Sequence, residues 1–327
     1  MKRSYLLMLV VLAFLLVFPE LTSDFSIILI LFLFFVYLAM ANSWNILAGY
    51  SGLVSLGGPA FVGIAGYALG AVTIVHVSPL IGIVIGGAAA SGFAFLIAFP
   101  TLRLRGLYFS IGTLMVTEAM SLFFIAFKPP GASSDQWGGA GLVIRGAEGV
   151  SLTELYYLAL VVGLLSIFVV RYVLRSKLGL GLKAIRDNEG AASSLGVNIF
   201  RSKLYSLMIS AFVTGLAAGV FYIFQGLIEP VTGFGISWLM IMLMATIVGG
   251  IGTEEGPIIG AIIVVVLQQY LAAYAGLNLL IQGLILVVVI SLAPRGLWGS
   301  ISKVIYRAGG KATPQTKVQA QAEPAKT

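Results

Sequence analysis

Few side chains in this sequence could carry out chemistry. The chain has no cysteine, which excludes a disulfide framework, a thiolate metal site and a cysteine nucleophile. Its single histidine, His76, excludes a metal centre built from several histidines. No G-x-x-x-x-G-K-S/T phosphate loop occurs, so the chain does not bind ATP in that way. The sequence therefore predicts a protein that is not an enzyme and that carries no metal or cofactor of its own.

One carboxylate, Glu118, lies near the middle of an apolar stretch at residues 106–127. A charged side chain at that depth in hydrocarbon costs roughly 2.5–3.5 kcal/mol on insertion scales, so it should face the helix bundle or a wet cavity. Two roles remain open for it: a gating or translocation-path residue, or a hydrogen-bond partner between helices. A proton-coupled pump would ordinarily show more titratable groups at membrane depth, which favours a path whose energy source lies elsewhere.

Residues 182–195 carry the pattern of a short amphipathic helix. Apolar residues recur there at helical spacing, and charged residues lie off that stripe. The stripe consists of Leu182, Ile185, Ala192 and Leu195, and the charged residues are Arg186, Asp187 and Glu189. Gly196 follows as a predicted C′ glycine that ends the helix. Such a helix could rest on anionic lipid headgroups, or it could dock in a groove of a cytoplasmic partner.

Two glycine-rich segments resemble each other. The first runs from Gly49 to Gly63 and the second from Gly249 to Gly260, and each contains a Gly-Pro pair that opens an apolar stretch. Paired, interrupted segments of this kind indicate an internal repeat in transporters. The alternative is a pair of tight turns between helices, which also use glycine and proline.

The elements that must position these residues are membrane spans. Hydrophobic residues make up 59% of the chain and charged residues only 9%, and the mean hydropathy is +1.06. A soluble domain carries about 25% charged residues, so this chain must dissolve in lipid. Its 40 glycines favour close packing of helices. Apolar stretches near the required length of about 20 residues predict an all-α integral membrane protein with about ten transmembrane helices, at residues 4–18, 26–48, 59–76, 79–100, 106–127, 153–174, 203–226, 236–250, 257–275 and 279–293.

The basic residues sort to one side of this predicted topology. With the amino terminus inside, every Lys and Arg except Lys128 and Arg145 lies on the cytoplasmic side, as the positive-inside rule requires. Both termini are then cytoplasmic, and the net charge of +7 needs no nucleic-acid partner. The first stretch could also be a cleaved signal peptide, but residues 18–23 lack a small-x-small cleavage pattern. We therefore expect an uncleaved first helix.

The predicted domain organisation is a transmembrane domain at residues 1–307 followed by a disordered cytoplasmic tail at 308–327. Within the transmembrane domain, a segment rich in Gly, Pro and Ser at 128–152 forms an extracytoplasmic loop. Residues 176–202 form the longest cytoplasmic loop. No soluble stretch is long enough for a nucleotide-binding domain, so any ATP would be bound by another subunit.

Several motifs follow one another in the order found in LivM-type permeases of branched-chain amino acid ABC transporters, which this chain resembles. The matching segments lie within residues 35–300 and are 42–67, Arg105–Phe109 with Thr113 and Glu118, Gly138–Leu142, Gly181–Gly196 and Ala293–Leu297. Two places depart from the family pattern. Gly190 precedes Ala191 and Ala192 where a pair of small residues commonly follows the glutamate directly, and Ala140 stands where serine is common.

The resemblance implies an importer in the inner membrane of a prokaryote, built from two permeases, two ATPases that bind ATP, and an extracytoplasmic substrate-binding protein. In the family the long cytoplasmic loop docks onto the ATPase. The implied coupling residues are Arg186, Asp187, Glu189 and Gly196, and the translocation-path candidates are Glu118, Gly52, Ser55 and Gly58. We therefore expect a permease subunit, in contact with membrane lipid, that moves branched-chain amino acids by alternating access.

Three other functions stay open from the residues alone. The cargo could be urea, a short amide or another amino acid, because nothing in the spans selects among them. The chain could also work alone as a secondary transporter or channel, which uptake without ATPase subunits would reveal. A membrane-embedded enzyme is disfavoured, since no nucleophile, metal set or acid pair converges.

Overall fold

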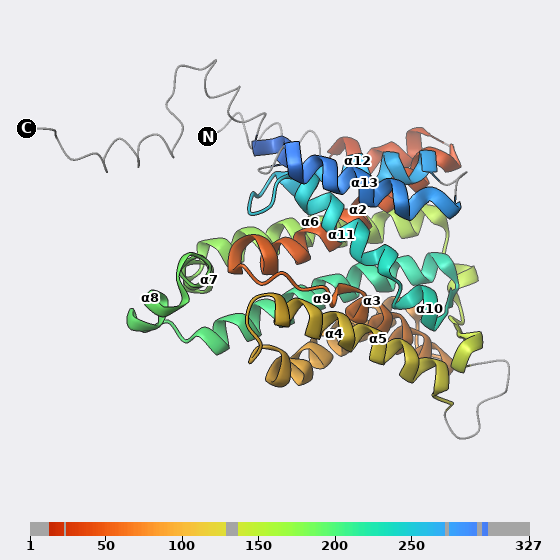
Figure 1. Ribbon diagram of the computed structural model, residues 1–327. Helices are drawn as coiled ribbons and strands as arrows, with labels where there is room; N and C mark the ends of the chain where they lie inside the picture. The colour runs from red at the N-terminus through yellow and green to blue at the C-terminus, as the bar shows by residue number, and fades with distance from the viewer. Residues whose placement is uncertain (1–12, 23, 129–136, 272–274, 293–295, 300–327) are drawn as a thin grey trace, which may run out of the picture.

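The computed structural model describes residues 13–22, 24–128, 137–271, 275–292 and 296–299. These residues form a bundle of helices with one short pair of strands (Figure 1). The expected tail at 308–327 and most of the expected first span at 4–18 lie outside the described residues.

In the described part of the chain, a helix occupies each expected span from 26–48 onward. The helices are α2 (Phe25–Asn45) with its π-helical extension η1 (Ile46–Tyr50), α3 (Gly58–Ile74), α4 (Pro79–Thr101), α5 (Leu107–Ala126), α6 (Leu152–Arg175), α9 (Ile199–Gln225), α11 (Ile236–Gly249), α12 (Gly256–Leu271) and α13 (Ala275–Leu292). Residues 13–21 are also helical. Among the described residues, seven helices are long and apolar enough to cross a membrane, and α3 and α12 are shorter apolar helices. The fold is therefore that of an all-α, multi-pass membrane protein.

Shorter elements connect the long helices. They are η2 (Gly138–Ala140), β1 (Leu142–Val143), η3 (Ala147–Gly149), α7 (Lys177–Asp187), α8 (Glu189–Ser194), β2 (Leu227–Ile228) and α10 (Pro230–Gly233). Strands β1 and β2 pair antiparallel, with Leu142 opposite Ile228. This pair ties the segment before α6 to the connection that leaves α9, at the end of the bundle away from α7 and α8 (Figure 1).

Local sequence signals set several helix starts. Ser151 and Glu154 form a reciprocal capping box at the start of α6, which satisfies two backbone N–H groups that would otherwise lack partners. Pro79 opens α4, where the missing N–H of proline is no loss. Asp24 caps α2 by accepting a hydrogen bond from the backbone N–H of Ser26 at 2.9 Å.

The core forms around α2, α3, α9 and α11, each of which has ten or more buried residues. Helix α9 packs closely against α4, because glycines meet at their crossing. A Cβ atom on Gly215 would lie 2.8 Å from the Cα atom of Gly87, so a larger side chain would force the two backbones apart. The glycine content thus provides close helix approach, as the composition predicts.

The outer surface carries many exposed large apolar side chains. Leu122 on α5, Phe168 on α6 and Leu284 on α13 are each more than 60% exposed. Exposure of such side chains over several long helices fits a surface that faces lipid or other membrane subunits. Helix α5 is especially open, since only four of its residues are buried.

Candidate functional site

Helices α7 and α8 project from one end of the bundle (Figure 1). The prediction of a single helix over residues 182–195 was wrong, because the chain forms two helices that meet at Asn188. Asn188 has an extended backbone, with φ −160° and ψ 111°, and its side chain accepts a hydrogen bond from Ala191 N at 3.0 Å. Asparagine favours this N-cap position over a helix interior, which explains the break.

The end of α8 follows the prediction in one respect and departs from it in another. Leu195 is 81% exposed, so the apolar stripe ends at the buried Ala192. Gly196 has a φ of +82° and follows the helix as its C′ residue. Its N–H bonds to the carbonyl of Ser193 at 2.9 Å, and Val197 N–H bonds to that of Ala192 at 3.0 Å. This is a Schellman motif, so the C′ glycine is confirmed.

Arg186 connects α7 to the interior of the bundle. Its Nη1 donates to the carbonyl oxygen of Gly49 at 2.9 Å, and its Nε and Nη2 donate to Asp187 Oδ1 at 3.2 Å each. Gly49 lies in the π-helix η1, where backbone carbonyls depart from the regular α-helical pattern. The guanidinium group therefore holds the end of η1 against α7.

A second ion pair holds α8 against α9. Lys203 Nζ lies 2.9 Å from Glu189 Oε1, and the lysine side chain is only 10% exposed. A buried cation requires such a partner because desolvation without one is costly. Lys203 was not among the predicted site residues. Its position at the start of the apolar stretch 203–226, with an acid in the preceding loop, was the signal that could have identified it.

A cavity of about 490 Å³ lies between this loop and the bundle, and we refer to it as the charged cavity. The structure brings together four of the predicted residues in its wall, which are Gly52, Arg186, Asp187 and Glu189. Arg105 and Lys203 add two further cations to the lining. Gly196 does not line the cavity, because it lies beyond the end of α8. Three residues predicted for coupling and one residue predicted for the path thus share one cavity.

Two other predicted path residues, Ser55 and Gly58, lie around a second cavity deeper in the bundle. This small cavity has a volume of only about 10 Å³, enough for about one water molecule. Polar groups cluster beside it: Ser43 Oγ lies 2.7 Å from Thr214 Oγ1, and Trp44 Nε1 donates to the carbonyl oxygen of Ser55 at 2.8 Å. An amino acid could not occupy this space unless the surrounding helices moved apart.

Glu118 does not face the interior of this chain, so its expected surroundings are not this chain's own helix bundle, and its role on the translocation path stays a prediction. It is exposed on α5, whereas the buried residues of that helix include Ser110 and Thr113. Ser110 Oγ donates to the carbonyl of Val54 at 2.6 Å, and Thr113 Oγ1 accepts from Leu56 N at 3.0 Å. These hydroxyls turn one face of α5 toward the non-helical segment after η1, so Glu118 points away from it.

Aromatic rings pack together at the end of the bundle near β1 and β2. Tyr67 stacks on Phe124 with ring centroids 4.1 Å apart, and Phe234 stacks on both, at 6.1 Å from Tyr67 and 5.4 Å from Phe124. Trp137 lies 6.2 Å from Tyr67 by the same measure. The charged cavity lies at the opposite end of the molecule, beside α7 and α8, so the two ends differ in chemical character.

The polar side chains that the structure describes do not form a metal site. Within the described ranges, no group of three or more His, Asp or Glu side chains is arranged to hold a metal ion. The polar side chains that line the two cavities are serines, a threonine, an asparagine and charged residues, which can bind, orient and transmit movement.

Comparison with known proteins gives a consistent family assignment. Residues 26–290 match the family described as "Branched-chain amino acid transport system / permease component". The LivM permease protein of the high-affinity branched-chain amino acid transport system of Escherichia coli K12 is 30% identical over 294 residues, covering 80% of this chain and 67% of the relative. The corresponding Salmonella typhimurium LivM is 28% identical over 80% of this chain and 67% of its own length.

A second kind of permease also matches. A probable LivH permease protein of Methanocaldococcus jannaschii is 29% identical over 171 residues, covering 50% of this chain and 52% of the relative. No solved structure matches the chain. The family match spans most of the sequence, and the apolar helices agree with it. The chain belongs to the family of permease components of branched-chain amino acid transport systems, which are transport proteins and not enzymes.

Proposed function

We propose that this chain is the permease subunit of an ABC importer in a prokaryotic inner membrane and that its cargo is a branched-chain amino acid. In this proposal it works with a second, LivH-like permease, two ATPase subunits that bind ATP, and an extracytoplasmic substrate-binding protein. It spans the membrane about ten times, with both termini and α7 and α8 in the cytoplasm. The basic residues of the 176–202 loop support that orientation.

One observation carries the mechanism: Arg186 on α7 donates a hydrogen bond to the carbonyl of Gly49 in η1. The chain that continues from η1 is non-helical over residues 52–57. Gly52 in this segment lines the charged cavity, and Ser55 lines the small one. A partner that moves α7 would therefore pull on the segment that borders both cavities.

The proposed cycle is alternating access. The binding protein delivers the amino acid at the aromatic end, and the ATPases change the position of α7 and α8 when they close on ATP. Different contacts of α7 and α8 with the two ATPase conformations supply the free-energy difference that a conformational change requires. Arg186, Asp187 and Glu189 are the proposed coupling residues, with Gly196 ending α8. The residues assigned to the proposed path are Gly52, Ser55 and Gly58.

Glu118 has a different place in this proposal. Because it lies exposed on α5 at membrane depth, lipid contact would cost free energy. We assign it to a path or interface shared with the second permease, where a polar group or water can meet the carboxylate.

The test is charge reversal at Arg186 in the complete transporter, reconstituted in proteoliposomes with ATP and the binding protein. Arg186→Glu removes the bond to Gly49, and we expect leucine uptake to fall at least about tenfold while membrane insertion stays normal. Lys183→Glu is the matched control, because it makes the same charge change on an exposed residue of α7 with no ion pair among the described residues. Normal uptake by Arg186→Glu would reject the coupling role, and uptake without ATPase subunits would reject the ABC mechanism.

A further inference from the structure

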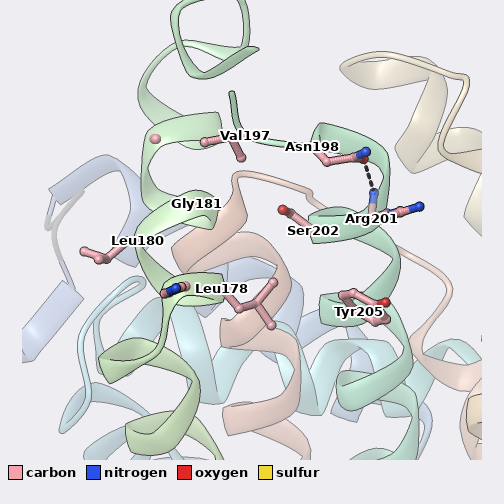
Figure 2. Close-up of a pocket in the computed structure, with 10 residues that line it drawn as sticks. Leu178, Leu180, Gly181, Val197, Asn198, Arg201, Ser202 and Tyr205 are labelled. Atoms are coloured by element: carbon pink, nitrogen blue, oxygen red, sulfur yellow. Dashed lines mark hydrogen bonds between the residues drawn. The ribbon is translucent and has the colours of Figure 1, made fainter. Parts of the chain in front are cut away.

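A second large pocket, of about 550 Å³, lies between α7 and the first turns of α9 (Figure 2). It shares no lining residue with the charged cavity that contains Arg186. Figure 2 shows Leu178 on the α7 side and Tyr205 on the α9 side of this pocket. Most of its lining is apolar, yet it opens at the end of the bundle where the loop cations lie.

Two cations line this pocket, Lys177 and Arg201, and no acidic residue does. Neither cation forms an ion pair with any residue in the described part of the chain. By contrast, Arg171 and Lys203 each pair with a glutamate. The pocket therefore presents two unneutralised positive charges beside apolar side chains.

Uncharged donors add to these cations. Asn198 Oδ1 accepts a hydrogen bond from Arg201 N at 3.0 Å, which leaves its Nδ2 group as a donor (Figure 2). Ser202 also lines the pocket and brings a hydroxyl group, which can donate to an anion. An anion with several oxygen atoms matches this combination of donors and cations.

The length of α9 allows the pocket to lie at the depth of lipid headgroups. Helix α9 has 27 residues, or about 40 Å at 1.5 Å per residue, whereas the hydrocarbon core is about 30 Å thick. Its first turns, which carry Arg201 and Tyr205, therefore extend toward the headgroup region. Tyr205 is 53% exposed and Leu180 is 67% exposed, which provides an apolar surface next to the cations.

We infer that this pocket binds an anionic phospholipid. The headgroup phosphate contacts Lys177 and Arg201, and an acyl chain lies along Leu178, Leu180 and Tyr205. Basic pockets between helices on the cytoplasmic side of a membrane protein bind anionic headgroups in this way. A bound lipid would contact both α7 and α9 and so stabilise one position of α7.

Native mass spectrometry of the full chain in detergent tests this inference, with phosphatidylglycerol and phosphatidylcholine as probes. We expect a preference for phosphatidylglycerol that falls at least about tenfold in the double variant Lys177→Gln/Arg201→Gln. The matched control, Arg103→Gln/Lys183→Gln, removes the same charge from residues outside the pocket and should keep the preference. Equal affinity of the unaltered chain for the two lipids, or an equal loss in the control, would overturn the inference.

Two further arms separate the possible occupants. Leu180→Asn should weaken phosphatidylglycerol binding if the acyl chain lies on this surface, and millimolar inorganic phosphate should not displace the lipid. Complete displacement of phosphatidylglycerol by phosphate, with no effect of Leu180→Asn, would overturn the inference and identify a free anion as the ligand. Weaker ATPase binding by the double variant with unchanged lipid binding would overturn it in favour of a protein partner. Lipid binding is measured without transport, so failure of the proposed transport function leaves this result interpretable.

Discussion

The two glycine-rich segments, 49–63 and 249–260, have similar sequences but different surroundings. Each makes a turn and then opens a short apolar helix at a Gly-Pro pair, α3 in the first case and α12 in the second. The segments lie against each other, because a Cβ atom on Gly49 would lie 2.6 Å from Gly252 N. Similar sequence patterns thus meet at one place in the bundle. The internal repeat itself stays a prediction.

The second segment is closed by contacts between backbones. A Cβ atom on Gly249 would overlap the carbonyl oxygen of Gly256, and one on Gly260 would overlap that of Ala245. The backbones of α11 and α12 are therefore in direct contact at two places, one next to their connection and one a helical turn further from it. A tightly packed turn of this kind is suited to holding two helices in a constant relation.

The first segment is open by comparison. Both segments have a non-helical part, at residues 52–57 and 250–255, but only the first borders the charged cavity and the small cavity. Side-chain hydrogen bonds hold its non-helical part: Ser110 Oγ donates to the carbonyl of Val54, and Trp44 Nε1 donates to that of Ser55. The first segment therefore borders open space, whereas backbone contacts confine the second, and we expect the first segment to be the one that moves.

The largest loss of stability should come from adding a methyl group to a glycine in the closed segment, residues 249–260. Gly260→Ala places Cβ against the carbonyl of Ala245, so α11 and α12 must separate. We expect a loss of about 3 kcal/mol or more in the free energy of unfolding, seen as a lower melting temperature and less monodisperse protein in detergent. Gly92→Ala is the control, because nothing lies within 4 Å of its Cβ position and alanine favours a helix. Equal melting of the two variants would show that the backbones are not in contact.

A smaller effect is expected where the two segments are joined. Asn45 Nδ2 donates to the carbonyl of Thr253 at 2.8 Å, and its Oδ1 accepts from Gly252 N at 2.8 Å. Asn45→Ala leaves both backbone groups without that partner, and the expected loss of stability is about 2–3 kcal/mol. Asn188→Ala, which removes an exposed helix cap, should cost about 1 kcal/mol. Thermal melting of both variants measures the difference, and a larger loss for Asn188→Ala would contradict it.

Much of this fold follows from apolar length alone. The stretch 153–174 predicts α6 almost to the residue, and the capping box of Ser151 and Glu154 explains why the helix begins where it does. The family signature around Arg186 likewise identified a segment that borders the charged cavity. Length and hydropathy indicate which stretches can lie in the membrane, and these spans are apolar on nearly every face.

The direction of a side chain around a membrane helix could not be obtained in the same way. When all faces of a helix are apolar, periodicity does not identify the packed face. The expectation for Glu118 rested on the cost of a charge in lipid alone, which does not say whether this chain or a neighbouring subunit covers the carboxylate. Asn188 broke the predicted helix through a local cap, and the ion pair of Lys203 with Glu189 depends on the position of α8 against α9. The packed face and the ion pair arise from tertiary contacts that no single stretch of sequence specifies.

A small effect on stability should separate side-chain contact from backbone strain beside the charged cavity. Gly52 and Gly106 both have positive φ, at +71° and +55°, and both line the charged cavity. Alanine at either position should cost about 1–2 kcal/mol, since such backbone conformations disfavour a Cβ atom. Only Gly52→Ala also meets Arg186, whose Cγ lies 3.1 Å from the new Cβ position, whereas nothing lies within 4 Å at Gly106. We therefore expect the two variants to melt at similar temperatures but only Gly52→Ala to lower leucine uptake severalfold. Equal uptake by the two variants would show that the contact between Arg186 and the open segment does not affect transport.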